Sequence, residues 1–216
     1  MIRAPGLRER KKLQTRHNLE EAALRLFARQ GFDATTVEDI AAEVEVSPRT
    51  FFRYFASKED VLLTDDEALR DGLLAALRDR PSDEPILSAI HGAVRIVAAR
   101  YEEIRNRLFL VYRLMTETPS LESHSLGLQA AWVSALAAEV GRRLGQDPGE
   151  LAPRLVARAA LSCLHSAAEV WFATQGRAHL PDLVDQAFAT LSTGLAELPA
   201  PRARPGVRPR PSGERR

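Results

Sequence analysis

The chain has 216 residues, 45% of them hydrophobic, and a formal net charge of +1. This length accommodates one or two domains, and the hydrophobic share is sufficient for a sizeable core. No apolar stretch approaches the roughly 18 residues of a membrane span, and no apolar signal segment is found near the start. The single cysteine excludes an intramolecular disulfide, so the sequence predicts a cytoplasmic protein without membrane association.

Charge is unevenly distributed along the chain. Residues 1–18 and residues 199–216 each carry a net charge of +5, whereas residues 61–198 carry −5. A basic segment can bind nucleic-acid phosphates or remain solvated. We expect residues 1–12 to form a disordered basic arm. Residues 199–216, with five Pro and six Arg, cannot bury a core and are expected to form a disordered tail.

A short capped helix is predicted to begin at Thr36. Its hydroxyl can accept a backbone N–H, and Asp39, three residues later, completes a capping box. The apolar residues that follow recur three and four positions apart, as on one face of a helix: Val37, Ile40, Ala41 and Val44. Three residues, 45–47, then separate this helix from a second one.

The second helix starts at Ser47 and Pro48, a capping residue followed by proline at the first helical position. Phe51 and Phe55 lie four positions apart and should pack inward. The opposite side carries Arg49, Thr50, Arg53 and Tyr54. Ser57 with Asp60 has the capping-box pattern and marks a third helix start. Two helices joined by so short a turn are typical of a helix-turn-helix motif.

The exposed side chains of this motif suit double-stranded DNA. Arginine can bond bidentately to guanine in the major groove, which makes Arg49 the first base-reading candidate and Arg53 the second. Thr36, Tyr54 and Lys58 carry donors that suit phosphate oxygens, and Lys58 also lies at a helix N-terminus. The alternative interpretation is that Phe51–Phe55 is a core segment with one solvated charge.

The pattern Thr35-Thr36-Val37-x-Asp39-Ile40-Ala41, followed by Val46-Ser47, Thr50–Phe55 and Ser57-Lys58-Glu59, resembles the DNA-binding domain of the TetR family of transcriptional regulators. Residues 22–32 are similar to the first helix of that family and its terminating glycine. The resemblance covers about residues 15–63 without gaps. It implies DNA contacts through Thr36, Ser47, Pro48, Arg49, Thr50, Phe52, Arg53, Tyr54 and Lys58.

Two positions depart from the family pattern. Glu45 stands in the turn where the family commonly has glycine, and it would be strained if that turn needs a positive φ. Phe52 stands where family members often have tyrosine, so a hydroxyl contact to phosphate is lost.

Helical patterns continue through the remainder of the chain, and strand signals are nearly absent. The sequence therefore predicts an all-α protein, with a three-helix helix-turn-helix domain over residues 13–57 and a six-helix ligand-binding and dimerisation domain over residues 58–198. The first two of the six helices are expected at about residues 58–80 and from the start signal 83–85 to about 100–103. The third holds residues 108–115 and ends before Pro119. The last three are expected at about 120–144, from the start signal 147–150 to about 175, and at about 181–197.

The last two helices carry more small and apolar residues than one face needs. This composition predicts a homodimer whose interface is a four-helix bundle, with packing inside the chain as the alternative. The resemblance also places the interface on these two helices. The candidate interface residues are Leu161, Leu164, Ala168, Leu183, Ala187, Phe188 and Leu191.

Polar and aromatic residues interrupt the apolar faces of the middle helices, which favours a pocket between helices. Its candidate lining is Tyr101, Phe109, Tyr112, Trp132, His165 and Trp171. The family resemblance implies a small-molecule effector here that shifts the DNA-binding heads. The stretch from Trp132 to Trp171 is similar to a subgroup that binds acyl-CoA-like or fatty ligands. Each residue alone is also compatible with ordinary interior packing.

An enzyme is not expected. Sequence signatures of nucleotide-binding loops, serine hydrolases and zinc proteases are missing, and the five histidines lack metal-ligand spacing. Neither a metal nor a cofactor is predicted. The function expected is that of a ligand-responsive transcriptional regulator, most simply a repressor of a palindromic operator. A constitutive DNA-binding dimer without a ligand is the alternative.

Overall fold

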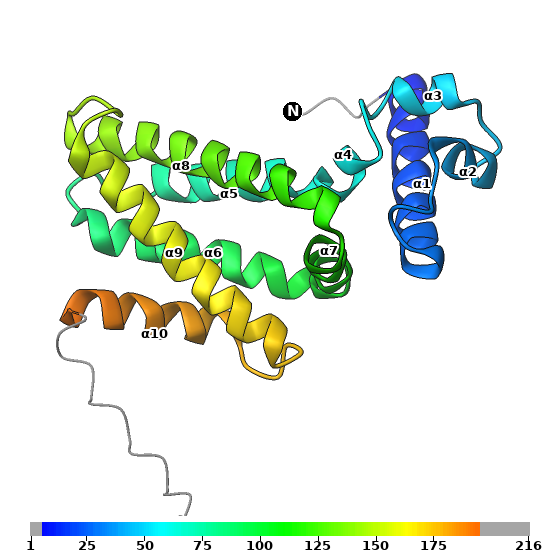
Figure 1. Ribbon diagram of the computed structural model, residues 1–216. Coiled ribbons are helices and arrows are strands. Elements are labelled where there is room, and N and C mark those ends of the chain that lie inside the picture. Colours follow the sequence, from blue (N-terminus) through cyan, green and yellow to red (C-terminus); the bar gives the residue numbers. More distant parts are fainter. Residues whose placement is uncertain (1–5, 195–216) are drawn as a thin grey trace, which may run out of the picture.

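The structure is a computed structural model that describes residues 6–194. These residues form α-helices, one short 3-10 helix and no strand, which confirms the all-α prediction (Figure 1). The helices are α1 (Leu7–Gln30), α2 (Val37–Glu43), α3 (Pro48–Phe52), α4 (Glu59–Leu62), α5 (Thr64–Arg78), α6 (Ile86–Glu103), α7 (Arg105–Glu117), the 3-10 helix η1 (Pro119–Leu121), α8 (Glu122–Leu144), α9 (Leu151–Ala173) and α10 (Leu180–Thr193).

Helices α1 to α3 form a small head at one end of the molecule (Figure 1). Its core is made by fully buried side chains that include Phe27, Ile40 and Phe51. Helix α1 starts at Leu7, so residues 7–12 are helical and not the disordered arm that was expected. Neither Gly nor Pro interrupts residues 7–30, and Arg, Lys, Glu and Leu favour helix there. Residues 1–5 lie outside the described part of the chain.

The prediction of one continuous helix over residues 58–80 is wrong, because the helix is interrupted at Leu63, between α4 and α5. Leu63 has φ −97° and ψ 3°, and the Thr64 hydroxyl donates to the Val61 carbonyl at 3.0 Å. Val61 and Leu62 pack into the head core. Leu69 and Leu73 pack into a second core, which belongs to the remaining part of the molecule. The break therefore lets two consecutive helices serve two different cores.

Five helices form the body. Helix α5 contacts α6 and α8, α6 contacts α10, α10 contacts α9, and α9 contacts α8, so the helices close into a bundle around one core. Fully buried side chains such as Leu73, Ile90 and Trp171 fill this core. Helix α10 ends at Thr193, and the expected tail over residues 199–216 lies outside the described residues.

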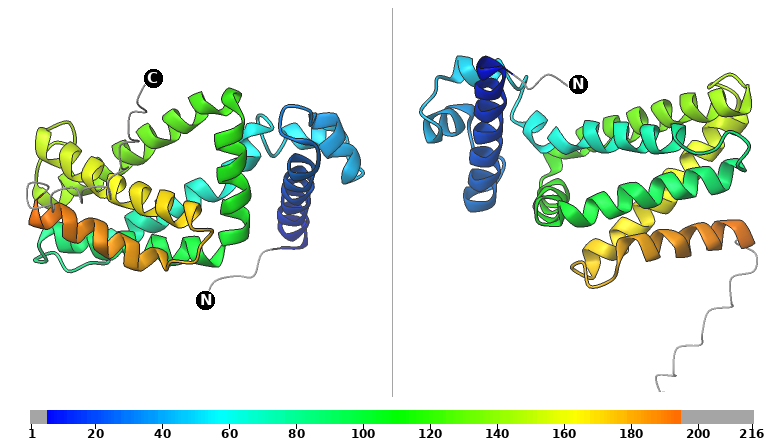
Figure 2. Two further views of the ribbon diagram at one scale, coloured as in Figure 1. Left: turned by 60° about the horizontal axis from the view of Figure 1, so that its bottom comes forward. Right: turned by 180° about the vertical axis from the view of Figure 1, so that it is seen from behind.

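Helix α7 lies between head and body, as the left view of Figure 2 shows. Its Leu114 is buried in the head core, and its Phe109 packs against the body core. Arg107 on the same helix forms ion pairs with Glu20 of α1 and Asp65 of α5, and it donates to the Val61 carbonyl of α4 at 3.3 Å. One side chain thus joins four helices across the boundary between head and body.

Candidate functional site

The capping box predicted at the start of α2 is present. The Thr36 backbone N–H and hydroxyl donate to the Asp39 carboxylate at 3.0 and 2.7 Å, and the Asp39 N–H donates to the Thr36 hydroxyl oxygen at 3.1 Å. The Thr36 bonds lower the pKa of the Asp39 carboxyl. Because Thr36 is exposed, the start of α2 is both fixed and open to solvent.

The turn between α2 and α3 places Glu45 at φ 56°, in the left-handed region. The Val46 N–H donates to the Ala41 carbonyl at 2.9 Å and the Glu45 N–H donates to the Ala42 carbonyl at 3.0 Å, which is a Schellman ending. Glu45 therefore carries the steric cost expected for a non-glycine residue there, about 1–2 kcal/mol. The turn keeps the geometry that glycine would give without strain.

Helix α3 exposes and buries the residues as its periodicity predicts. The Ser47 oxygen accepts the Thr50 N–H at 3.3 Å, and Pro48 occupies the first helical position. Phe51 is fully buried, whereas the neighbouring Phe52 is 55% exposed. Backbone hydrogen bonds continue beyond the helix end to Phe55, which is also buried.

Arg49 and Arg53 differ in their surroundings although both are exposed. The Arg53 guanidinium lies over the Tyr54 ring at 5.0 Å and donates to the Tyr54 hydroxyl at 3.1 Å. For Arg49, no hydrogen bond or ion pair to another side chain in residues 6–194 is present. Arg49 is therefore free to meet a ligand without first breaking a contact within the described chain.

Lys58 is engaged inside the head. Its ammonium donates to the carbonyl oxygens of Phe32 and Thr35 at 2.8 and 2.9 Å, and it lies 4.3 Å from the centre of the Phe32 ring. The side chain is partly buried. It joins the start of α4 to the loop between α1 and α2. A phosphate contact, which the sequence suggested for Lys58, would have to compete with these two bonds.

Replacing Lys58 with Met is expected to lower the free energy of unfolding by about 2 kcal/mol, because hydrogen bonds to charged groups contribute roughly 1.5–3 kcal/mol. The melting temperature should fall by about 4–8 °C. Thermal unfolding followed by circular dichroism measures this, with Lys11→Met in the exposed part of α1 as the control. An unchanged melting temperature, with the salt slope of DNA binding reduced by about one, would instead assign Lys58 to a phosphate.

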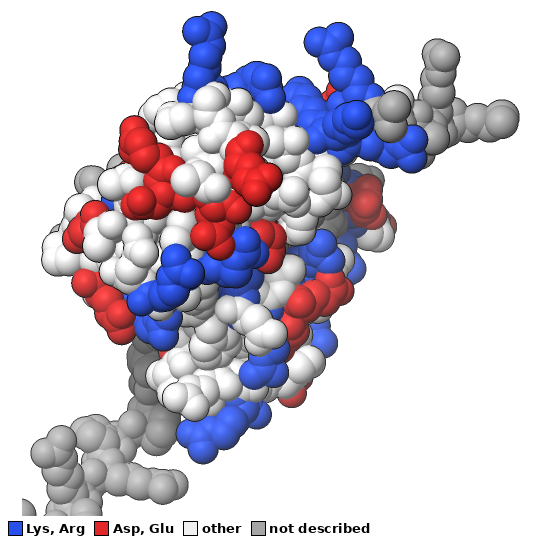
Figure 3. Space-filling model, turned by 90° about the vertical axis from the view of Figure 1, so that its right-hand side faces the viewer, with Lys and Arg blue, Asp and Glu red and all other residues white. Residues whose placement is uncertain are grey.

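Figure 3 shows the face of the molecule that carries the head. Positively charged side chains gather along its upper right edge, and acidic side chains gather in its upper middle part. The first turns of α1 supply a series of exposed basic residues: Arg8, Arg10, Lys11, Lys12 and Arg16. A positive edge beside the helix-turn-helix motif suits the phosphates of a nucleic acid.

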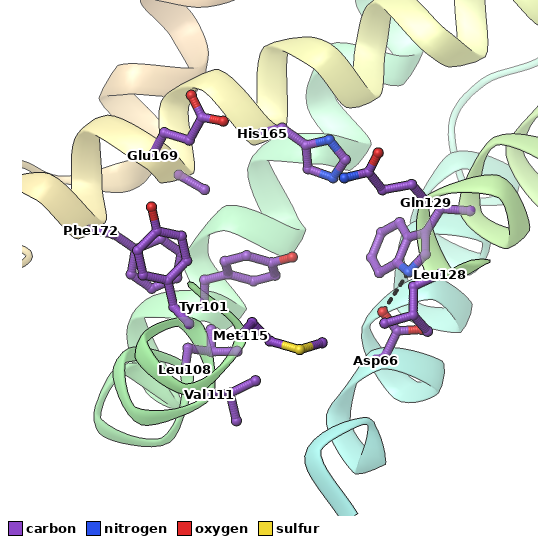
Figure 4. Close-up of a pocket in the computed structure, with 13 residues that line it drawn as sticks. Asp66, Tyr101, Leu108, Val111, Met115, Leu128, Gln129, His165, Glu169 and Phe172 are labelled. Atoms are coloured by element: carbon purple, nitrogen blue, oxygen red, sulfur yellow. Dashed lines mark hydrogen bonds between the residues drawn. The ribbon is translucent and has the colours of Figure 1, made fainter. Parts of the chain in front are cut away.

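A cavity of about 310 Å³ lies in the body, between α5, α6, α7, α8 and α9 (Figure 4). Four of the predicted lining residues surround it: Tyr101, Tyr112, Trp132 and His165. The remaining residues that line it, which were not among those predicted, are Asp66, Leu108, Val111, Met115, Leu128, Gln129, Ala168, Glu169 and Phe172. Its volume falls at the low end of the roughly 300–1,000 Å³ typical of small-molecule sites.

Two predicted lining residues lie elsewhere. Trp171 is fully buried in the body core, and Phe109 packs beside it with ring centres 4.8 Å apart. Phe109 lines a neighbouring cavity, together with Arg105 and Arg113. These corrections have one cause. An aromatic residue on an interior helix face can fill the core or line a void, and only the packing of several helices decides which.

The sequence missed Asp66, the most informative polar group of the cavity. The Trp132 indole N–H donates to its carboxylate at 2.7 Å, shown by the dashed line in Figure 4. Burial raises the pKa of the Asp66 carboxyl, although the Trp132 bond opposes this. Burial likewise raises the pKa of the Tyr101 hydroxyl and lowers that of the His165 ring. Asp66 follows Asp65 and precedes Glu67, so its pattern was that of a solvated helix start.

The candidate interface residues divide into two groups. Leu161, Leu164, Ala168 and Phe188 are buried within this chain, and Ala168 lines the cavity. For these four side chains, packing inside the chain accounts for their apolar character. Leu183, Ala187 and Leu191 of α10 are only partly buried. The surface of α9 also exposes Leu151, Leu155 and Val170, by 80%, 59% and 47%.

Among the helices of residues 6–194, none combines the length and apolar composition that a membrane crossing requires. Within the same residues, no group of three or more His, Cys, Asp or Glu side chains is arranged to hold a metal ion.

Comparison with known proteins adds an independent line of observation. The family profile described as bacterial regulatory proteins of the tetR family matches residues 19–64, and that of the MftR C-terminal domain matches residues 81–196. The chain is 43% identical over 159 residues to the HTH-type transcriptional regulator TcmR of Streptomyces glaucescens, which covers 70% of each chain. It is 30% identical over 191 residues to the transcriptional regulator MftR of Mycobacterium tuberculosis, covering 88% of this chain and 95% of MftR.

Solved structures share the fold. FadR of Thermus thermophilus, a repressor in complex with lauroyl-CoA, superposes with a TM-score of 0.58 at 22% identity, covering 88% of this chain and 99% of FadR. FadR of Bacillus subtilis, in complex with stearoyl-CoA, gives 0.54 at 16% identity, covering 80% and 95%. The two matching family profiles and the identity with TcmR and MftR show that the chain belongs to the TetR family of bacterial transcriptional regulators.

Proposed function

We propose that this protein is a homodimeric, ligand-responsive repressor that binds a palindromic operator. The observation that carries this proposal is the surface of α3 and its flanking residues. Arg49, Phe52 and Arg53 are exposed there, while the buried Phe51 fixes the helix to the head. An arginine at the start of a recognition helix, with no competing partner in the described chain, is suited to guanine in the major groove.

The other polar groups of this surface are assigned to phosphate contacts that fix the register of the protein on DNA. Thr36, Ser47 and Tyr54 present hydroxyl groups beside α3, and the basic start of α1 adds positive charge. Such contacts hold phosphates and fix the orientation of the protein, but they do not distinguish bases. Pro48 and Thr50, both partly buried, complete the base-facing side.

Replacing Arg49 with Ala is expected to weaken binding to the operator by about 1–3 kcal/mol and to relax sequence preference at one base position. The probe is the DNA upstream of the protein's own gene, measured with excess random competitor at physiological salt. The unaltered protein should bind with a Kd of about 10⁻⁸ to 10⁻¹¹ M. Arg113→Ala, an exposed arginine on α7, is the control and should change neither quantity. Equal losses on operator and random DNA for Arg49→Ala would remove its base-reading role.

A second copy of the chain is proposed to cover the exposed faces of α9 and α10. Exposed apolar side chains recur along α9 at Leu151, Leu155 and Val170, and α10 contributes the partly buried Leu183 and Leu191. Two copies would then form a four-helix bundle from these helices. A dimer also presents two recognition helices to half-sites about 34–36 Å apart or a multiple of that spacing.

Leu155→Glu is expected to convert the dimer to a monomer at micromolar concentration, because the interface would have to bury an unpaired charge. Sedimentation velocity measures the change. Ile96→Glu is a matched control, since Ile96 is 55% exposed on α6 and lies outside the proposed interface. A Leu155→Glu protein that remains dimeric, or an Ile96→Glu protein that dissociates, would place the interface elsewhere.

The effector is proposed to be a small, largely apolar molecule that binds the cavity of the body. The acyl-CoA complexes of the two FadR proteins suggest an acyl-type ligand, and Leu108, Val111 and Leu128 provide an apolar lining. Asp66 lies on α5, next to Asp65, which pairs with Arg107 and through it with α1. A ligand that moves this region would change the position of the head and so weaken DNA binding. DNA must then weaken effector binding by the same factor.

A further inference from the structure

The acidic side chains that line the cavity have no basic counterpart in the lining. Asp66 contributes a carboxylate from α5, and Glu169 contributes another from α9, on opposite sides of the space in Figure 4. Among the described residues, neither Lys nor Arg lines the cavity. Burial lowers the pKa of the His165 ring and so disfavours a positive charge there, although the Glu169 carboxylate opposes this. An anionic ligand would therefore meet the partly buried Asp66 and the exposed Glu169 in the lining, while the Arg70 guanidinium, 4.0 Å from Asp66, lies outside the lining.

The Asp66 carboxylate has unused capacity to accept hydrogen bonds. One oxygen accepts the Trp132 indole N–H at 2.7 Å, and the Arg70 guanidinium is 4.0 Å from the other oxygen, too far for a hydrogen bond. A carboxylate removed from water gains from each added donor, and it gains most from a charged one. A ligand that brings an N–H group to this oxygen would supply the second hydrogen-bond donor of the Asp66 carboxylate.

Aromatic rings form much of the cavity wall, and two of these rings are nearly parallel. The Tyr112 and Phe172 rings stack with centres 4.0 Å apart and planes 9° apart, and Tyr101 and Trp132 lie on other sides of the space. Flat ligands stack well against such rings. The faces of aromatic rings are also electron-rich, which favours a positive charge near them.

Positive charge is available nearby, but in a separate place. Arg105 and Arg113 line the neighbouring cavity, which shares Tyr112 and Phe172 with the first one. The stacked pair therefore borders both cavities. A phosphate that used Arg105 or Arg113 would be held outside the acidic cavity.

We propose that the cavity takes a flat aromatic ligand that presents N–H donors, above all a protonated amine, and that it rejects anions. This inference rests on the proposed function as a ligand-responsive regulator, and it replaces the acyl-type effector with an aromatic amine. The amine would meet Asp66 or Glu169, and the ring system would lie among Tyr101, Tyr112 and Phe172.

Three probes of nearly equal shape test the proposal: 1-naphthylmethylamine, 1-naphthalenemethanol and 1-naphthoate, which are cationic, neutral and anionic at pH 7. Calorimetry on the full-length protein gives their affinities. The amine is expected to bind about tenfold more tightly than the alcohol, since a charge-assisted bond is about twice as strong as a neutral one. The carboxylate is expected to bind more weakly than the alcohol.

Variants of the same shape but without the negative charge show which carboxylate gives the amine its higher affinity. Asp66→Asn removes the charge and keeps an oxygen that can accept the Trp132 N–H, so the fold of the cavity is retained. Asp66→Asn, Glu169→Gln or the double variant should abolish the advantage of the amine and leave the alcohol unchanged. Glu117→Gln, an exposed residue of α7 outside the cavity lining, is the control.

The proposal is overturned if 1-naphthoate binds as tightly as the amine, if neither Asp66→Asn nor Glu169→Gln weakens binding of the amine, or if the amine fails to bind at millimolar concentration. A measurement of operator binding distinguishes failure of the ligand-class proposal from failure of the proposed function. DNA release by lauroyl-CoA but not by the amine would reject the ligand class and retain the regulator. A protein that binds the amine but no upstream DNA would reject the operator assignment and retain the cavity chemistry.

Discussion

Replacing Phe51 with Ala is expected to lower the free energy of unfolding by about 3–5 kcal/mol, the range for removing a large buried aromatic side chain. Phe51 is fully buried in the head core, and its ring lies 5.4 Å from that of Phe55. Without it, α3 loses its attachment to the head, so operator binding should be lost as well. Urea unfolding monitored by circular dichroism measures the stability change.

The adjacent residue provides the matched control. Phe52 is 55% exposed and its removal leaves no cavity, so Phe52→Ala should change stability by less than about 0.5 kcal/mol. It should reduce DNA affinity, because its exposed ring is assigned to the base-facing side. Similar loss of stability in both variants would show that α3 is not oriented as described.

Replacing Arg107 with Met is expected to destabilise the protein by about 3–5 kcal/mol, because removing one partner of a buried ion pair leaves the other charge uncompensated. The Arg107 side chain is 18% exposed and the paired Glu20 side chain 9%. Burial already raises the pKa of the Glu20 carboxyl even though Arg107 opposes it. Thermal unfolding at pH 7 measures the loss.

A functional consequence should accompany that loss. Arg107 joins α1, α4 and α5 to α7, so its removal should weaken the dependence of DNA affinity on the effector as well as stability. Arg113→Met, on the same helix but exposed, is the control for helix content and charge. A melting temperature equal to that of Arg113→Met would show that the three charges contribute nothing at the boundary.

Local chemistry determined much of the head. The Thr36–Asp39 capping box, the Ser47 cap and the inward and outward directions of Phe51 and Phe52 depend on residues within four positions of one another. Such features can be read from sequence because local side-chain caps and the helix period set them. Glu45 adopts the positive φ for the same reason, since the ending of α2 is defined by its own backbone hydrogen bonds.

The tertiary structure decided the features that join distant segments. Lys58 meets carbonyls 23 and 26 residues away, and Trp132 meets Asp66 across 66 residues. Periodicity marked Tyr101 and Trp171 alike as interior aromatics, but one lines a void and the other fills the core. The sequence by itself therefore determined the all-α class, the helix-turn-helix motif and the family, but not the break at Leu63 or the start of α1 at Leu7. The partner of each buried charge and the site of the cavity depended on how helices cross, which no local pattern encodes.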